Sequence, residues 1–345
     1  MPGPGRSGQS LPLSTAPVTT ASPLDHIRGI TTYWASLTGR SAESLPYKQW
    51  RMLLDTLGLG IEQVMRHVGS QRPDYTGFGA WIIETAGLPD PVTVARYNAQ
   101  VDGIAPPATV VERLAAVDAA PPVFDDADLA DWDEKGVIVL RNAITAAEAA
   151  AAADVLWQQV GGHADDPDSW YGGPRENGIM IQHFQHPAQT RIRRSPRILK
   201  AFAQLWGTTD LWMTTDRMSF NPPERPDYRF PGPHLHWDAS LTQPMPFGTQ
   251  GILYLTDTAA DQGALQLVPG FHRRIGAWLD RLDGLNPRQV DLSAEAVTVP
   301  AGAGELVIWR EDLPHGASPN RSRRPRLAQY LNMYSPVPGP ERPWL

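Results

Sequence analysis

Three residues that can bind a metal ion place the strongest constraint on how this chain folds. His236 and Asp238 are two positions apart, and a third candidate ligand, His315, lies far downstream. On an extended strand, residues two positions apart project from the same face, so the first two side chains can reach one ion. The third ligand must come from a remote strand, which requires a fold that brings distant strand ends together. Two imidazoles and one carboxylate on one face of a metal leave three positions open, as in non-haem Fe(II) oxygenases.

The short pair of His and Asp is a weak signal when it is taken alone, because these residues also cap turns and fill polar pockets. His234 offers an alternative ligand, but the residue two positions after it is His236 rather than a carboxylate. We therefore favour a role for His234 beside the metal or against a substrate.

A cation downstream of the third histidine suits an acidic co-substrate. Arg326 begins an apolar run that we interpret as a strand. Its guanidinium can bind a carboxylate through two parallel hydrogen bonds. The arginines before it are also consistent with a solvated loop or a nucleic-acid patch. Alternation along the strand predicts a pocket face formed by Arg326, Ala328, Tyr330, Asn332 and Tyr334, and an opposite face formed by Leu327, Gln329, Leu331 and Met333.

Composition is compatible with a metal-dependent protein that acts on a small molecule. The chain has 345 residues and no cysteine, so a metal must be held by histidine and carboxylate. Its net charge of -7 gives no general attraction to nucleic acid or to anionic membranes. No apolar span approaches the roughly 18 residues of a transmembrane helix. We expect a cytoplasmic protein with a small-molecule substrate.

The distribution of proline, glycine and apolar residues divides the chain into three parts. Residues 1–21 are rich in Pro, Gly, Ser and Thr, and we predict that they form a disordered tail. They lack the basic start and apolar run of a signal peptide. Residues 22–120 are predicted to be a helical region with a linker, and residues 121–345 a domain rich in strands. The helical region has several candidate roles: it can buttress the core, cover the site, form a homodimer or contact a carrier protein. Its helices are predicted from Ser22 onward and at 47–57, 61–68, 92–100 and 110–117.

The last part of the chain reads as a mostly β core with flanking helices. A capping box at Thr145 and Glu148 predicts a helix that Gly161 ends. Short apolar runs separated by Gly, Pro and Asp predict an antiparallel sandwich or barrel. The predicted strands lie at 137–140, 211–220, 251–256, 264–268, 297–299, 305–309 and 326–334.

These segments resemble the phytanoyl-CoA dioxygenase (PhyH) family of Fe(II)- and 2-oxoglutarate-dependent oxygenases. The matching pieces, at 133–140, 234–238, 263–272 and 315–326, follow the order of the family. The resemblance implies a double-stranded β-helix core, which is a cupin-like jelly-roll. It also implies that His236, Asp238 and His315 bind iron and that Arg326 binds the distal carboxylate of 2-oxoglutarate.

Further site residues follow from the resemblance alone. It implies that Met218 lines the pocket, that Tyr254 lies beside the co-substrate and that Gln182 makes a polar contact to it. Ordinary core packing is the alternative for the first two residues. Some members have a hydroxyl two residues after the distal histidine, whereas this chain has Ala317.

The implied activity is oxidation of a small molecule with O2, with release of succinate and CO2. Related halogenases lack the metal-binding carboxylate, so Asp238 favours hydroxylation or another oxidation. A secondary metabolite, an amino acid or an acyl derivative is the expected substrate, and the loop at 221–232 is where we expect specificity. The alternative is a catalytically silent jelly-roll that binds a metal or small ligand.

Overall fold

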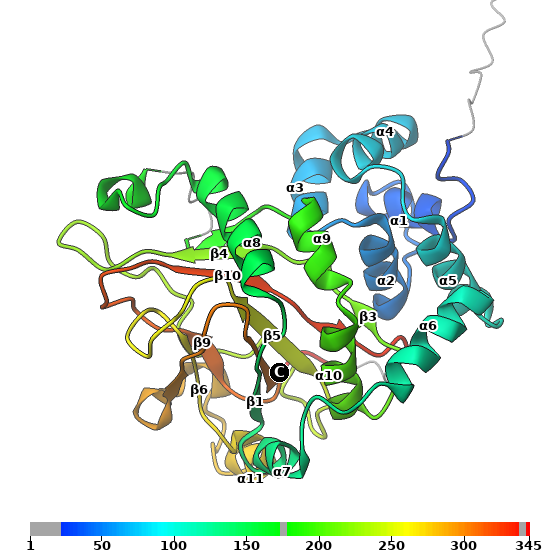
Figure 1. Cartoon of the computed structure of the whole chain (residues 1–345). Coiled ribbons are helices and arrows are strands. Elements are labelled where there is room, and N and C mark those ends of the chain that lie inside the picture. Colours follow the sequence, from blue (N-terminus) through cyan, green and yellow to red (C-terminus); the bar gives the residue numbers. More distant parts are fainter. Residues whose placement is uncertain (1–21, 173–177, 338–342) are drawn as a thin grey trace, which may run out of the picture.

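A group of N-terminal helices lies beside a β core that is itself covered by helices (Figure 1). This computed structural model describes residues 22–172, 178–337 and 343–345. The predicted tail at 1–21 lies outside the described residues. The predicted sheet-rich core with helices is present, but helices and 3-10 turns hold 41% of the described residues and strands 15%, so the described chain is not mostly β. The helical N-terminal region and the helices on the sheet account for the difference.

The N-terminal region contains six helices, and most of them are the predicted ones. The first begins at Ile30 and not near Ser22, because residues 22–29 form turns and Gly29 adopts a left-handed conformation with φ 73°. One helix was missing from the prediction, since Gly77 and Gly79 lower its helix propensity. The helices are α1 (Ile30–Leu37), α2 (Tyr47–Leu57), α3 (Ile61–Gln71), α4 (Tyr75–Ala86), α5 (Pro91–Asp102) and α6 (Ala108–Ala119).

The main sheet has six antiparallel strands in the order β1-β8-β5-β10-β4-β2. The predicted strand at 326–334 is interrupted, because the chain leaves the main sheet after Tyr330 and then pairs elsewhere. The strands are β1 (Val137–Leu140), β8 (Leu306–Arg310), β5 (Thr249–Tyr254), β10 (Arg326–Tyr330), β4 (Met218–Asn221) and β2 (Met180–Ile181).

Two smaller sheets complete the core. One contains β7 (Val297–Val299), β6 (Leu265–Leu267) and β9 (His315–Ala317), in that order. The other pairs β3 (Trp212–Met213) with β11 (Met333–Tyr334), so the predicted strand at 211–220 is divided between β3 and β4. The expected pocket face therefore ends at Tyr330, and Tyr334 packs among the N-terminal helices instead.

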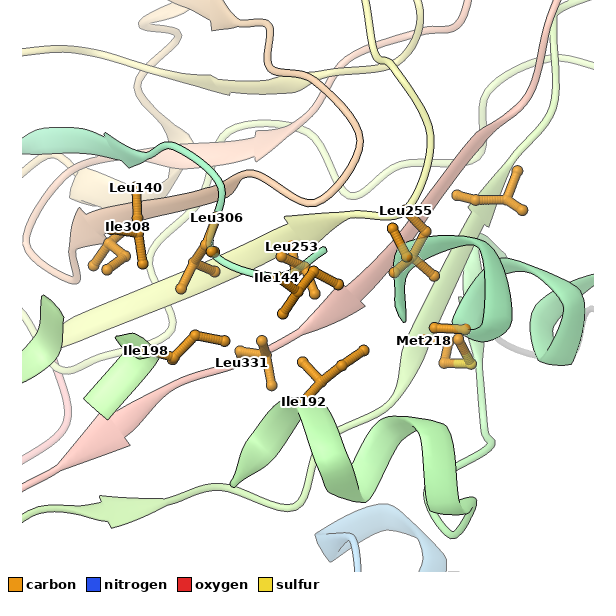
Figure 2. Close-up of a cluster of buried hydrophobic side chains, with 14 of the residues drawn as sticks. Leu140, Ile144, Ile192, Ile198, Met218, Leu253, Leu255, Leu306, Ile308 and Leu331 are labelled. Carbon is orange, nitrogen blue, oxygen red and sulfur yellow. The ribbon is translucent and has the colours of Figure 1, made fainter. Parts of the chain in front are cut away.

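Alternate residues of the main sheet enter two different cores. Leu253, Leu306 and Ile308 point toward the helices (Figure 2), whereas Ile252 and Tyr254 face the three-stranded sheet. The predicted capping box is confirmed, since Thr145 accepts a hydrogen bond from the amide of Glu148 at the start of α8. The helices of the β part are α7 (Asp126–Lys135), α8 (Ala146–Val160), α9 (Pro187–Arg193), α10 (Pro196–Trp206) and α11 (Ile275–Leu279), with 3-10 turns η1 (Pro167–Tyr171), η2 (Phe271–Arg273), η3 (Pro287–Gln289) and η4 (Ser293–Glu295).

A half-buried carboxylate joins the N-terminal helices to the β core. Asp55 of α2 accepts hydrogen bonds from the Thr215 amide at 2.6 Å and from the Tyr334 hydroxyl at 2.7 Å. Burial raises the pKa of Asp55 to about 6, although these hydrogen bonds and Arg51 act in the opposite direction. The carboxylate therefore favours the protonated state in the folded protein more than in the unfolded chain.

This shift predicts how the stability depends on pH. The folded-state pKa of about 6 is above the ordinary value of 3.8, so the contribution of Asp55 is largest at low pH and falls as pH rises through this interval. The difference in unfolding free energy between the wild type and Asp55→Asn should therefore decrease from about pH 4 to about pH 7. Denaturant unfolding at several pH values measures it, with exposed Asp154→Asn as the control. A difference that grew with pH would contradict the assignment.

Candidate metal centre

His236, Asp238 and His315 come together in the structure. Each offers a ligand atom, and these atoms all lie within 4.8 Å of one another. The Nε2 atom of His236 lies 3.3 Å from Oδ1 of Asp238, and Nε2 of His315 lies 3.4 Å from Oδ2. Across the described ranges, no other His, Asp and Glu side chains form such a group of three or more. The two-residue spacing and the remote histidine thus meet as the sequence predicts.

Backbone pairing brings the two histidines side by side. The amide of each donates to the carbonyl of the other, with N to O distances of 2.9 and 3.0 Å. Gly316 is required here, because a Cβ atom at this position would lie 2.4 Å from the carbonyl oxygen of His234. The bridge at His236 is isolated, so the expected strand does not continue to Asp238.

Hydrogen bonds orient both imidazoles toward the carboxylate. Nδ1 of His236 lies 2.7 Å from the His234 carbonyl, and Nδ1 of His315 lies 3.0 Å from the Leu313 carbonyl. A carbonyl can only accept, so each Nδ1 carries the proton and each Nε2 can coordinate a metal. The His234 side chain lies instead against Phe230, with ring centroids 5.5 Å apart. This placement favours His236 over His234 as the ligand.

The two histidines stabilise the charged form of the Asp238 carboxylate. Burial pushes the pKa of Asp238 upward, but hydrogen bonds and charge from the two histidines outweigh burial and hold it well below its usual range. Burial also lowers the pKa of His236, but its hydrogen bonds to Asp238 and His234 raise the value above 6.5 overall. The site therefore keeps its anion over a wide pH range and gains protons on nitrogen in acid, where they compete with a metal.

A glutamine that the sequence did not reveal holds the second oxygen of the carboxylate. Nε2 of Gln250 donates to Oδ2 of Asp238 at 2.6 Å, and Oε1 of Gln250 accepts from the Trp309 indole at 3.1 Å. The two residues are cross-strand partners in β5 and β8. Gln250, Ile252 and Tyr254 are alternate residues of β5 and share its inner face, and this alternation could have identified Gln250 from the sequence.

Arg326 is a buried cation without an anionic partner in the described part of the chain. It is 1% exposed, and its Nη2 atom donates to the Ser219 hydroxyl. Its Nε atom and the Thr256 hydroxyl are buried, and neither has a hydrogen-bond partner within the described residues. Burying an unpaired charge costs several kcal/mol. An anion of matching size would therefore be stabilised here, and the carboxylate of an oxo-acid fits this requirement.

The remaining predicted site residues lie in three different environments. The hydroxyl of Tyr254 donates to the Val299 carbonyl and accepts from the Leu265 amide, so it joins β5 to the three-stranded sheet. Met218 lies in the core under the helices (Figure 2), and the expectation that it lines the pocket is wrong. Its neighbour Ser219 has the inward position, because alternate residues of β4 face opposite sides.

Gln182 lies against α3 and away from the three metal ligands. Its Nε2 atom donates to Glu62 at 2.6 Å, and its side chain lines a cavity of about 320 Å³ between α3, Trp81 and Phe184. The contact to a co-substrate that the resemblance implies is not formed by this geometry. Gln182 connects the β core to the N-terminal helices instead.

Comparisons with known proteins place the chain beside one family. The family model described as "Phytanoyl-CoA dioxygenase (PhyH)" matches residues 90–328. A Dictyostelium discoideum protein described as "Putative phytanoyl-CoA dioxygenase" is 20% identical over 257 residues, which are 59% of this chain and 73% of that protein. None of the helices in the described ranges has the length and apolar character needed to cross a membrane.

Two solved structures illustrate the likeness in three dimensions. AviO1 from Streptomyces viridochromogenes Tue57 has a TM-score of 0.46 and 18% identity, covering 65% of this chain and 100% of that chain. Apo EctD from S. alaskensis has a TM-score of 0.45 and 18% identity, covering 63% and 79%. At these scores the likeness adds nothing to the match with the family model.

Gln250→Leu is predicted to weaken metal binding without unfolding the protein. The substitution removes the hydrogen bond that fixes Oδ2 of Asp238, and losses of about 10-fold are typical when such a partner is removed. Calorimetric titration of the apo-protein with Co(II) measures the change. The exposed Gln159→Leu on α8 is the matched control. Wild-type affinity in Gln250→Leu would show that Asp238 does not depend on this contact.

Proposed function

Because the chain belongs to the phytanoyl-CoA dioxygenase (PhyH) family, whose members are Fe(II)- and 2-oxoglutarate-dependent oxidoreductases, we propose that it hydroxylates or otherwise oxidises a small molecule. A secondary metabolite, an amino acid or an acyl derivative is the proposed substrate, and succinate and CO2 are the proposed co-products. The observation that carries the proposal is that the chain combines an intact group of candidate metal ligands with the buried Arg326, which has no anionic partner among the described residues.

The donor set fits Fe(II). His236, Asp238 and His315 would hold the ion through two imidazole nitrogens and one carboxylate oxygen, which leaves positions for an oxo-acid and O2. When bound, iron would activate O2, which is the oxidant, and the oxidative decarboxylation of 2-oxoglutarate to succinate and CO2 would supply two of the electrons needed to reduce it. The protein residues hold and orient these groups and exclude water from the buried end of the site.

Ser219 and Thr256 are proposed to complete the carboxylate site around Arg326. Ser219 already contacts the guanidinium, and Thr256 has a buried hydroxyl without a partner in the described residues. Leu255, next to Thr256, pairs its amide with the Leu327 carbonyl next to Arg326. These hydroxyls would replace the one that Ala317 lacks. Hydrogen bonds from a charged donor and neutral hydroxyls would fix one end of the oxo-acid.

The fold and the remaining partners follow as part of the same proposal. The six-stranded and three-stranded sheets share one hydrophobic core, in which Ile252 of β5 and Leu265 of β6 take part, and this packing supports a double-stranded β-helix. We propose residues 121–345 as this jelly-roll domain and 22–120 as a region that buttresses it. Asp238 supports oxygen transfer over halogenation, since it occupies the metal position that a halide would need.

The alternative is a catalytically silent jelly-roll that binds a metal. Conversion of 2-oxoglutarate to succinate without a second substrate distinguishes the enzyme from this alternative. The wild type should form succinate from 2-oxoglutarate with Fe(II), whereas His236→Ala and Asp238→Ala should lose at least about 100-fold of this activity. Mass spectrometry of succinate measures the reaction. His26→Ala, an exposed position in the N-terminal region, is the control. Wild-type succinate formation by both triad variants would exclude the assigned ligands.

Arg326→Met tests the co-substrate site through stability. Replacing an unpaired buried cation with an apolar side chain of similar length should leave the apo-protein as stable as the wild type or more so. With the metal already bound, 2-oxoglutarate at 100 times its dissociation constant should stabilise the wild type by about 2.7 kcal/mol beyond the metal alone, and should give the variant no such further stabilisation. Thermal unfolding measures both effects, with exposed Arg323→Met as the control. Equal stabilisation of Arg326→Met would overturn the assignment.

A further inference from the structure

The chain loses its backbone pairing at the point where it presents Asp238. Pairing with β9 stops at His236, and the described backbone makes no backbone hydrogen bond at 237–239. Trp237 is buried against Phe271 and Trp278, and its indole donates to the Asp312 carbonyl at 3.1 Å. The carbonyls on either side of Asp238 therefore need another donor if this metal ligand is to stay in place.

Arg288 supplies these missing hydrogen bonds. Its Nη1 atom donates to the Trp237 carbonyl and its Nη2 atom to the Ala239 carbonyl, each at 2.7 Å. The guanidinium thus spans the residue between them, which is Asp238. No Asp or Glu side chain forms an ion pair with Arg288 in the described ranges, and its planar donor group is directed at main-chain oxygens.

A segment distant in sequence holds the other side of Arg288. The carbonyl of Leu345 accepts from its Nε atom at 3.2 Å and from its Nη2 atom at 2.8 Å. The Trp344 ring stacks on the guanidinium, with 4.6 Å from Cζ to the ring centroid. Two hydrogen bonds and one ring contact thus help to fix the orientation of the guanidinium.

The same segment is attached directly to the chain that follows Asp238. The Ser240 hydroxyl donates to the Pro343 carbonyl at 2.7 Å and accepts from the Leu345 amide at 3.1 Å. The Leu241 amide donates to the Leu345 carbonyl at 3.3 Å. Pro343, Trp344 and Leu345 therefore run along residues 240–242 and complete the support on which Arg288 rests.

We propose that Arg288 is a positioning residue for the iron ligand Asp238 and that the segment 343–345 holds Arg288 in place. The inference rests on the proposed function only in taking Asp238 as an iron ligand. Partial burial lowers the pKa of Arg288, while the charge of Asp238 acts to raise it. Lysine at this position would keep the charge but lose the fork that reaches both carbonyls.

The test is metal affinity in the full chain, measured without substrate. Apo-protein is titrated with Co(II) by calorimetry, and the Fe(II)–2-oxoglutarate charge-transfer absorption is recorded without oxygen. Arg288→Ala should lose about 10- to 100-fold of its metal affinity, the range found when residues that orient metal ligands are removed. Arg288→Lys should lose affinity as well. Deleting 343–345 should weaken binding in the same direction, and Ser240→Ala should do so to a smaller extent.

The controls separate positioning from general loss of structure. Arg281→Ala removes a nearby exposed arginine whose side chain makes no hydrogen bond or ion pair in the described residues, and it should bind metal as the wild type does. Circular dichroism and thermal unfolding show whether each variant is folded. If the folded Arg288→Ala protein binds Co(II) within about twofold of the wild type, the proposal is wrong. If Arg288→Ala weakens metal binding but deletion of 343–345 does not, the proposed role of 343–345 in holding Arg288 is wrong.

Failure of the proposed function gives a different result. A wild type that binds Fe(II) but forms no succinate contradicts the proposed oxygenase activity, while the loss of metal affinity in Arg288→Ala still supports positioning. A wild type that binds no Fe(II) or Co(II) contradicts both. Normal succinate formation by the wild type together with unchanged metal affinity in folded Arg288→Ala overturns the positioning role alone.

Discussion

The pair of backbone hydrogen bonds between His236 and His315 is the constraint on which the site depends. Each residue donates to the other at 2.9 to 3.0 Å, so two segments far apart in sequence are fixed in one register. The register sets both imidazoles beside Asp238, and carbonyls two residues earlier set their tautomers. Gly316 permits this approach, because any side chain would meet the His234 carbonyl. The metal ligands are thus placed by main-chain geometry before any ion binds.

Among the described residues, the carboxylate of Asp238 and the guanidinium of Arg326 each lack a partner of opposite charge that a ligand could supply. Asp238 lies beside the Nε2 atoms of His236 and His315 and accepts a hydrogen bond from Gln250, whereas Arg326 is buried without a described anionic partner. A cation between the histidines and a carboxylate at Arg326 would complete both halves. Under the proposed function, a small dicarboxylic oxo-acid that also binds the metal would satisfy both halves.

The sequence predicted the ligands better than it predicted their surroundings. Residue types and spacing identified His236, Asp238, His315 and Arg326 as candidates, because donor chemistry and alternation are local properties, and the family resemblance gave them their expected roles. Gln250 and Arg288 were not predicted, since they act through contacts across strands or to main-chain carbonyls, which carry no pattern. Met218 was expected to face the pocket, but its neighbour Ser219 has that position, because successive residues of a strand face opposite sides. The helices at 47–57 and 61–71 were visible as amphipathic patterns, whereas the glycines of α4 concealed a helix that packing stabilises.

The division of the main sheet into two cores has a consequence for how such a protein can change over time. Leu253 and Ile308 pack in the core under the helices, while their neighbours Ile252 and Trp309 pack in the core on the other side of the sheet. Successive positions of one strand are therefore exposed to different selection: fold maintenance on one side and molecular recognition on the other. Inner positions can diversify while the helix-covered side stays the same. A lineage can thus acquire new specificities on an inherited scaffold, without having to evolve a new fold for each.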